Sequence, residues 1–265
     1  MEEFRNYLQL KNYQKSTIKQ YINRTKQFLE YQEKTAKTIN DYYQELQNKN
    51  LKNSSLNSYL LALKNYTSYL KDTQKEIFNT PVLRKKVVFE TIAILTKEEI
   101  KILFQAAQKR PDYHQRDQAV LGCLYHLALR ASEAINLKIT DIDFENKLVF
   151  IAKSKTGHQR QVPMNESITM IFKSYLNQRN FSKTTNDFLL IGQRGKLKSV
   201  NSIETILKVI TKNSGLQKRI YPHLLRHSIA THLLQNGMPL EKVSQFLGHK
   251  SIGSTQRYTH FNYEL

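Results

Sequence analysis

The sequence predicts a mainly α-helical protein, with a helical N-terminal domain and a mostly helical second domain that contains a small β-hairpin or sheet. Apolar residues recur at helical spacing through the first 70 residues and again from residue 100 onward. Residues 77–95 interrupt this periodicity. A single β-branched and aromatic run, Leu148 to Ile151, favours a strand over a helix.

The first domain is predicted over residues 1–78 and consists of short helices. Thr17 and Gln20 form a capping-box pattern, in which each side chain accepts a hydrogen bond from the other residue's backbone, so a helix should begin there. A shorter helix is predicted over residues 38–46, and another follows the polar Asn53-Ser54-Ser55. The apolar positions that define the two longer helices are Ile18, Tyr21, Ile22, Phe28 and Leu29 in one, and Leu56, Leu60, Leu63, Tyr66 and Leu70 in the other.

A linker is predicted over residues 79–95, between this domain and a second one over residues 96–265. Pro81 and the basic trio Arg84-Lys85-Lys86 break the helical pattern there and precede an extended-looking apolar stretch. Such a segment is typical of a connection between two domains.

The second domain is predicted to open with a helix and to carry a hairpin. Thr96 and Glu99 have capping-box spacing ahead of a new apolar helical pattern. The strand at residues 148–151 is expected to pair with residues 160–163 across a polar tip that contains Gly157. Lysines lie near this tip.

The composition points to a polyanionic partner. Lys and Arg number 41 against 22 Asp and Glu, a formal net charge of +19 that is spread over both predicted domains. Nucleic acid is the expected partner of such a field, although an AT-rich genome would also enrich a chain in lysine. Two interpretations stay open for the basic positions of the first helix, phosphate contact or a solvated surface; these positions are Lys15, Lys19, Arg24 and Lys26.

The composition also excludes some classes of protein. A single cysteine cannot form an internal disulfide. No apolar run approaches the ~20 residues of a membrane span, and no charged-then-apolar leader is visible. We therefore expect a cytoplasmic protein without a membrane partner.

The segment from His223 to Tyr258, HLLRHSIATHLLQNGMPLEKVSQFLGHKSIGSTQRY, suits chemistry on a phosphodiester. His223 and Arg226 lie three residues apart at a predicted helix start, so both can face one phosphate. His249 and Tyr258 follow downstream. A tyrosine is a poor nucleophile at neutral pH, because its phenol has a pKa of ~10, unless nearby cations or a proton acceptor activate it.

Simpler interpretations compete for several of these residues. Arg130 follows an apolar helical segment, and with Glu133 three residues on it also suits a surface ion pair. His223, His227 and His232 lie at near-helical spacing and could suggest zinc, but no cysteine pair or HExxH motif supports a metal. We therefore expect no metal site.

In chain order, Arg130, Lys155, His223, Arg226, His249 and Tyr258 resemble the residue set of the tyrosine recombinase family, which includes phage integrases and Xer-like enzymes. The resemblance covers essentially the whole chain and is carried by LALRASEAINL, the hairpin, HLLRHSIATHLL and LGHKSIGSTQRYTH. It implies that residues 1–78 form a core-binding, SAM-like DNA-binding domain. Residues 96–265 would then form the catalytic domain.

The resemblance implies a role for each arginine and for the tyrosine. Arg130 and Arg226 would hold the non-bridging oxygens of the phosphate, where they would stabilise the charge of the transition state. Tyr258 would attack phosphorus, forming a 3′-phosphotyrosyl link and releasing a 5′-hydroxyl. This link keeps the energy of the phosphodiester, so the resemblance implies no cofactor, ATP or metal.

The remaining site residues would move protons or bind the phosphate. Lys155 on the hairpin would protonate the leaving 5′-oxygen as general acid, and Lys153 is the alternative for this role. His223 would accept a proton or bind phosphate, and His249 would donate a hydrogen bond to the phosphate.

Several other residues are interpreted without a catalytic role. Tyr263 lies fourteen residues beyond His249, whereas Tyr258 lies nine beyond it in a family-like TQRYTH. Cys123 and His126 are expected to be buried core residues.

Two features depart from the family pattern. Leu127-Ala128 replace the Thr-Gly that often precedes the first arginine, and only seven residues follow Tyr258. Relatives commonly donate a C-terminal helix to the next protomer. Two explanations stay open, a truncated chain or a different coupling between protomers.

Together, the residues and the resemblance predict a site-specific DNA recombinase, of Xer-like or small mobile-element type, that clamps duplex DNA. Four protomers would bring two recombination sites together. The alternatives are a non-catalytic DNA-binding regulator with the same fold and a type IB topoisomerase-like enzyme.

Overall fold

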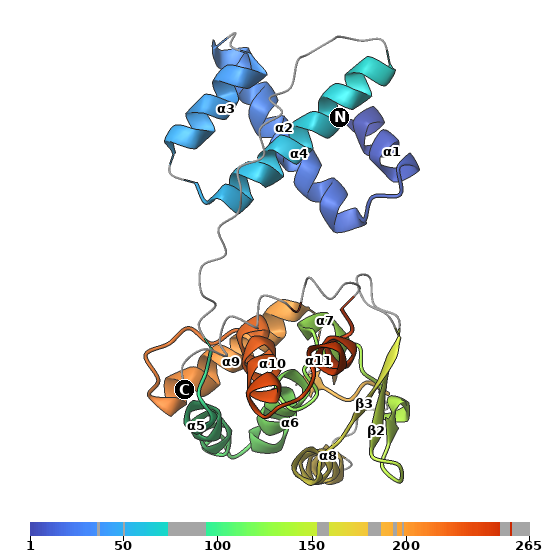
Figure 1. Cartoon of the computed structure of the whole chain (residues 1–265), viewed down its shortest axis with the longest axis vertical. Coiled ribbons are helices and arrows are strands. Elements are labelled where there is room, and N and C mark those ends of the chain that lie inside the picture. Colours follow the sequence, from blue (N-terminus) through green and yellow to red (C-terminus); the bar gives the residue numbers. More distant parts are fainter. Residues whose placement is uncertain are drawn as a thin grey trace. The chain divides into compact units, whose positions relative to one another are not determined.

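A computed structural model of the chain describes residues 1–35, 38–49, 51–73, 94–152, 159–179, 187–192, 195–197, 199–249 and 255. The chain divides into two units, Met1–Glu90 and Thr91–Leu265, which are described one at a time (Figure 1). Nearly all of the predicted linker, residues 79–95, lies outside the described residues, so the predicted boundaries at residues 78 and 96 stay predictions.

Helices make up the described part of the first unit. They are α1 (Glu2–Leu10), α2 (Lys15–Thr35), α3 (Ile39–Asn48) and α4 (Asn53–Asp72). Helices α2 and α4 pack against each other. They contribute to two small apolar cores, one shared with α1 and the other with α3. Phe4 and Leu8 of α1 fill one core, while Phe28 and the apolar face of α3 fill the other. The helical prediction for this region is therefore confirmed.

One predicted helix start is wrong. Helix α2 begins at Lys15, so Thr17 lies inside its first turn and not at its N-cap. The backbone N–H of Ile18 already donates to the carbonyl of Gln14 at 2.9 Å, which places the first helical hydrogen bond upstream of the predicted start. Helix α1 had no specific prediction. By contrast, Thr96 caps the next unit's first helix as predicted, accepting from the Glu99 N–H at 3.1 Å.

The second unit is built around helix α6 (His114–Leu124), which is buried from Ala119 to Leu124. Helices α5 (Lys97–Ala107), α8 (Glu166–Arg179), α9 (Val200–Ser214) and α10 (Pro222–Gln235) surround it (Figure 1). The short elements α7 (Ala131–Ala134), η1 (Ile139–Asp141) and α11 (Leu240–Leu247) complete the described helices. One continuous apolar core joins helices α5 to α10 with the three-stranded sheet. Helix α11 packs against α10 through a separate small cluster that includes Val243 and Leu247. Together these contacts hold the site residues in a fixed frame.

The predicted hairpin is present as part of a three-stranded antiparallel sheet. Strands β1 (Ile142–Asp143), β2 (Leu148–Ile151) and β3 (Arg160–Pro163) follow one another in sheet order. Leu148 pairs with Pro163 at one end of the hairpin, and Ile151 pairs with Arg160 at the other. The predicted tip, with Gly157, lies outside the described residues. A second, very small sheet of β4 (Ile191–Gly192) and β5 (Gly195–Lys196) had not been predicted.

No described helix is both long enough and apolar enough to cross a bilayer.

Candidate active site

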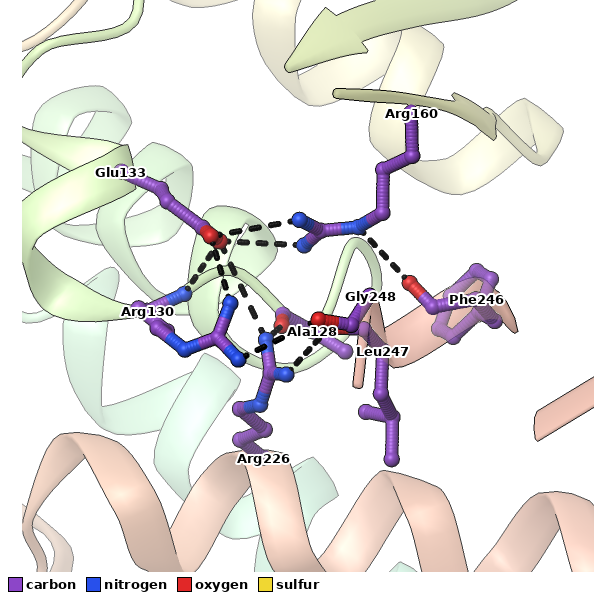
Figure 2. Close-up of polar contacts among 8 residues, drawn as sticks. All are labelled: Ala128, Arg130, Glu133, Arg160, Arg226, Phe246, Leu247 and Gly248. Carbon is purple, nitrogen blue, oxygen red and sulfur yellow. Dashed lines mark hydrogen bonds and ion pairs between the residues drawn. The ribbon is translucent and has the colours of Figure 1, made fainter. Parts of the chain in front are cut away.

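A buried carboxylate lies at the centre of a group of arginines in the second unit (Figure 2). Glu133 belongs to α7 and its side chain is 2% exposed. Around it lie Arg130 at the N-cap of α7, Arg160 at the start of β3 and Arg226 in the second turn of α10. Three elements that are distant in sequence therefore meet at one carboxylate.

The contacts to Glu133 are short and charge-assisted. Arg130 donates to it twice, from Nη1 at 2.8 Å and from its backbone N–H at 2.9 Å. Arg160 donates from Nη1 and Nη2 to the two carboxylate oxygens at 3.2 and 3.0 Å, in a fork geometry. Nη1 of Arg226 lies 3.9 Å from Glu133 Oε2.

The same three arginines also hold the C-terminal end of α11. Three consecutive carbonyls there accept from three different side chains: Phe246 from Arg160 Nε at 2.9 Å, Leu247 from Arg226, and Gly248 from Arg130 at 3.4 Å (Figure 2). These carbonyls are ones that a helix end leaves without intrahelical partners. The arginines therefore complete the helix end and fix where the chain continues to His249.

Backbone geometry explains why α11 stops at this point. Gly248 has φ of +64°, and the N–H groups of Gly248 and His249 donate to Gln245 and Ser244 at 2.9 and 3.1 Å. This is a Schellman motif, which ends a helix with a left-handed residue. His249 then lies immediately beyond the arginine group, with its Nδ1 2.8 Å from Thr255 Oγ1.

A second left-handed residue, Ala128, helps to hold Arg226. Ala128 has φ of +47°, and its carbonyl accepts a hydrogen bond from Nη1 of Arg226. In the family pattern that the sequence resembles, glycine often occupies the position of Ala128. A positive φ is the conformation that glycine adopts without strain.

The site is electropositive. Three guanidinium groups face one carboxylate, which leaves a net charge of +2 in the group. Burial alone would raise the pKa of Glu133, but the hydrogen bonds and charge of Arg160, together with the hydrogen bonds from Arg130, lower that pKa to about 2. Glu133 is therefore ionised at neutral pH, and the excess positive charge suits an anion such as a phosphate.

His223 lies at the start of α10, close enough to the arginines to sense their charge. The residue is exposed, and its ring stacks on that of His227 with the ring centroids 6.1 Å apart. Desolvation, and then the positive charges of Arg226 and Arg130, lower the pKa of His223. The neutral imidazole, which is able to accept a proton, is the favoured form.

The structure brings together the predicted site residues that it describes. Arg130 and Arg226 meet at Glu133, His223 interacts electrostatically with both arginines, and His249 follows the carbonyls that they bind. Lys155, its alternative Lys153, Tyr258 and Tyr263 lie outside the described residues. The predicted general acid and nucleophile therefore stay predictions.

The interpretation of Arg130 and Glu133 as a surface ion pair is wrong, because the side chain of Glu133 is 2% exposed and that of Arg130 only 17%. In the sequence, Glu133 is recognisable only as a partner of Arg130, and Arg160 only as a strand residue. The Arg-x-x-Glu spacing was a signal for the first contact. No sequence signal pointed to the Arg160 contact, which joins residues 27 positions apart.

Two further histidines have side-chain partners, and the cysteine is buried. His232 Nδ1 lies 2.8 Å from the hydroxyl of Tyr125, and His126 Nδ1 lies 3.4 Å from Asn165 Nδ2. Cys123 is fully buried, and burial raises the pKa of its thiol. Within the described segments, no three or more His, Cys, Asp or Glu side chains gather as metal ligands would.

Comparisons with known proteins agree with this geometry. The model of the phage integrase family matches residues 93–264. Tyrosine recombinase XerC of Oceanobacillus iheyensis is 36% identical over 171 residues, which cover 63% of this chain and 56% of that protein. Tyrosine recombinase XerA of Pyrococcus furiosus is 33% identical over 264 residues, covering 98% of this chain and 88% of the relative.

Solved structures show the same fold. A crystal structure of XerA recombinase aligns with 99% of the chain and 93% of the XerA chain, at 29% identity and a TM-score of 0.60. A XerH site-specific recombinase bound to a palindromic difH substrate aligns with 93% of the chain and 76% of the XerH chain, at 23% identity and a TM-score of 0.78.

Proposed function

Because the chain belongs to the phage integrase family of tyrosine recombinases, we propose that it is a site-specific DNA recombinase, of Xer-like or small mobile-element type. It would cleave and rejoin DNA through a 3′-phosphotyrosyl intermediate. The observation that supports this most strongly is the arginine group around Glu133, where Arg130 and Arg226 are held together with excess positive charge beside His223 and His249.

Each step of the proposed reaction has a candidate residue. Arg130, whose side chain is 17% exposed, and Arg226 would bind the non-bridging oxygens and stabilise the charge that gathers on them as phosphorus becomes pentavalent. His223 would accept the phenolic proton of Tyr258 as the tyrosine oxygen bonds to phosphorus. The lowered pKa of His223 supports this role, because the neutral form has to be present at neutral pH.

The leaving group requires a proton in the same step. The bond from phosphorus to the 5′-oxygen breaks, and Lys155 would donate its ammonium proton to that oxygen, with Lys153 as the alternative donor. His249 would donate a hydrogen bond to the phosphate. Rejoining would run the same steps in reverse, with the 5′-hydroxyl as nucleophile.

The proposed partner is duplex DNA that carries a recombination site, bound by both domains as a clamp. The net charge of +19 supports such a partner, and the XerH structure that shares this fold was solved with DNA. Assembly of four protomers on two sites belongs to the proposal. Phosphate contacts would supply most of the affinity, and base contacts the choice of site.

The test is covalent capture of DNA. A binding site would first be selected from random-sequence duplexes, then placed in a nicked suicide substrate and incubated with wild type and Tyr258→Phe. We expect a protein–DNA adduct on a denaturing gel for wild type and none for the variant. Tight binding by wild type without an adduct would favour a DNA-binding regulator, and relaxation of supercoiled DNA without the site would favour a topoisomerase.

A further inference from the structure

Arg160 links the hairpin to the two other elements that form the site. It is the first residue of β3 and pairs with Ile151, so it lies at the end of the hairpin that leads to the tip. Its side chain is 7% exposed and reaches away from the sheet to Glu133 on α7 and to the carbonyl of Phe246 on α11 (Figure 2).

The donors of Arg160 are directed at the protein. Nη1 and Nη2 donate to the two oxygens of Glu133 at 3.2 and 3.0 Å, and Nε donates to Phe246 at 2.9 Å. A guanidinium held by three such contacts is rigid, because its planar fork matches the carboxylate and its stem is packed. These contacts attach the start of β3 to α7 and to the end of α11.

The position of Gly248 shows how closely the arginine is packed. A Cβ atom added to Gly248 would lie 2.9 Å from Nη1 and 3.0 Å from Cδ of Arg160. Glu133, in turn, is the residue that orients Arg130. The end of the hairpin and the phosphate-binding arginine are therefore fixed to the same carboxylate.

We propose that Arg160 is a positioning residue that fixes the end of the hairpin beside Arg130 and Arg226, and that the proposed general acid depends on this anchor. Lys155 precedes Arg160 by only five residues. A general acid has to lie within hydrogen-bond reach of the leaving oxygen, so a small displacement of the hairpin removes proton donation. This inference rests on the proposed recombinase function.

The test compares two leaving groups in the suicide substrate. With a 5′-bridging sulfur in place of oxygen, the leaving group is a thiolate, whose conjugate acid has a pKa of roughly 8.5, so it leaves without a proton. In Arg160→Gln, we expect single-turnover cleavage of the oxygen substrate to fall on the order of 100-fold, because general acid catalysis contributes 10²–10⁴-fold. Cleavage of the sulfur substrate should stay within about 10-fold of wild type.

Lys147→Gln is the matched control. Lys147 precedes β2 at the opposite end of the hairpin and makes an exposed ion pair with Glu166. Its substitution also removes one positive charge, yet we expect both substrates to be cleaved within about threefold of wild type. Equal losses on the oxygen and sulfur substrates in Arg160→Gln would overturn the proposal, because Arg160 would then act through the arginines or α11.

A second variant controls for misfolding, and a measurement without DNA tests the anchoring role independently of the proposed function. Arg160→Lys keeps the charge but lacks the fork, and it should show the same dependence on the leaving group to a smaller degree. In the DNA-free chain, hydrogen exchange in β2 and β3 should rise in Arg160→Gln but not in Lys147→Gln. Unchanged exchange in these strands would refute the anchoring role even if wild type cleaved neither substrate.

Discussion

At the scale of single residues, Glu133 governs the electrostatics of the site. It is a buried carboxylate that receives hydrogen bonds from Arg130 and Arg160. Without its negative charge, buried guanidinium groups would face one another in a medium that screens them poorly. We therefore expect Glu133 to be required for the fold of the site before any DNA binds.

Glu133→Gln should destabilise the protein by about 3–5 kcal/mol, the usual result of removing one partner from a buried ion pair. The pKa of Glu133 is lowered from 4.5 to about 2, so its contribution is present above pH 4.5 and is lost as the pH falls toward 2. This shift corresponds to roughly 3 kcal/mol. Urea unfolding at pH 7 and at pH 3 should show a smaller pH dependence in Glu133→Gln than in wild type.

Glu166→Gln is the control for this experiment, because Glu166 pairs with Lys147 on the surface with 71% of its side chain exposed. It should unfold almost as wild type does at both pH values. A Glu133→Gln protein with wild-type stability would show that the arginines do not depend on the carboxylate.

His223 should titrate below the ordinary histidine pKa of about 6.5 in the DNA-free protein. Desolvation and the charges of Arg226 and Arg130 favour its neutral form. Its contribution to stability is therefore lost as the pH falls below 6.5, since the unfolded chain binds the proton first. NMR titration should give a pKa for His223 that is lower in the folded protein than in the unfolded chain. Arg130→Gln should raise the pKa of His223 in the folded protein, and an unchanged pKa would contradict the electrostatic coupling.

Arg130, His223, Arg226 and His249 could be identified from the sequence, because each lies in a short motif whose residues are neighbours along the chain. The convergence of Arg160 on Glu133 could not be predicted in this way. It depends on how β3 packs against α7, and side-chain direction across such an interface is set by tertiary structure.

At the scale of elements, the end of α11 is the feature on which the site depends most. Gly248→Ala places an L-residue at φ of +64° and drives its Cβ into Arg160. Strain alone should cost about 1–2 kcal/mol, and displacement of Arg160 should add to it. Thermal unfolding and the cleavage assay should both show the loss.

Gly215→Ala separates the two effects. Gly215 ends α9 with φ of +75°, and a Cβ there would meet nothing within 4 Å. Gly215→Ala introduces the same backbone strain as Gly248→Ala but no contact between its Cβ and another side chain. It should therefore destabilise the protein less and leave DNA cleavage near wild type. Equal effects of the two substitutions would mean that the Arg160 contact is unimportant.

The two predicted helix starts show why a capping pattern locates the start of a helix in some places and not in others. Thr96 has its reciprocal partner Glu99 and begins a helix as predicted, and the two described residues before it, 94 and 95, are not helical. Thr17 has a similar pattern, but the carbonyl of Gln14 already accepts from Ile18, so the helix has begun before the threonine is reached. A capping box is decisive only where the preceding backbone cannot form the first turn.

At the scale of the whole molecule, the sequence predicted the mainly helical fold and the hairpin, because helical periodicity and β-branched runs are local signals. Charge predicted the kind of partner but not which lysines meet it. The basic residues of α2 left two interpretations open, phosphate contact or a solvated surface.

Lys15, Lys19 and Lys26 have the placement that phosphate contact requires, and a salt titration can decide between the two interpretations. All three are exposed, and at ~100° per residue they lie within roughly 40° of one another around α2, as a single basic stripe. Each phosphate contact contributes about 0.9 to the slope of log affinity against log salt. Replacing all three lysines with Gln should therefore reduce that slope by about 2 to 3, measured by fluorescence anisotropy with a DNA duplex at several salt concentrations. The melting temperature should stay unchanged, because none of the three side chains is buried, and an unchanged slope would assign the stripe to solvent.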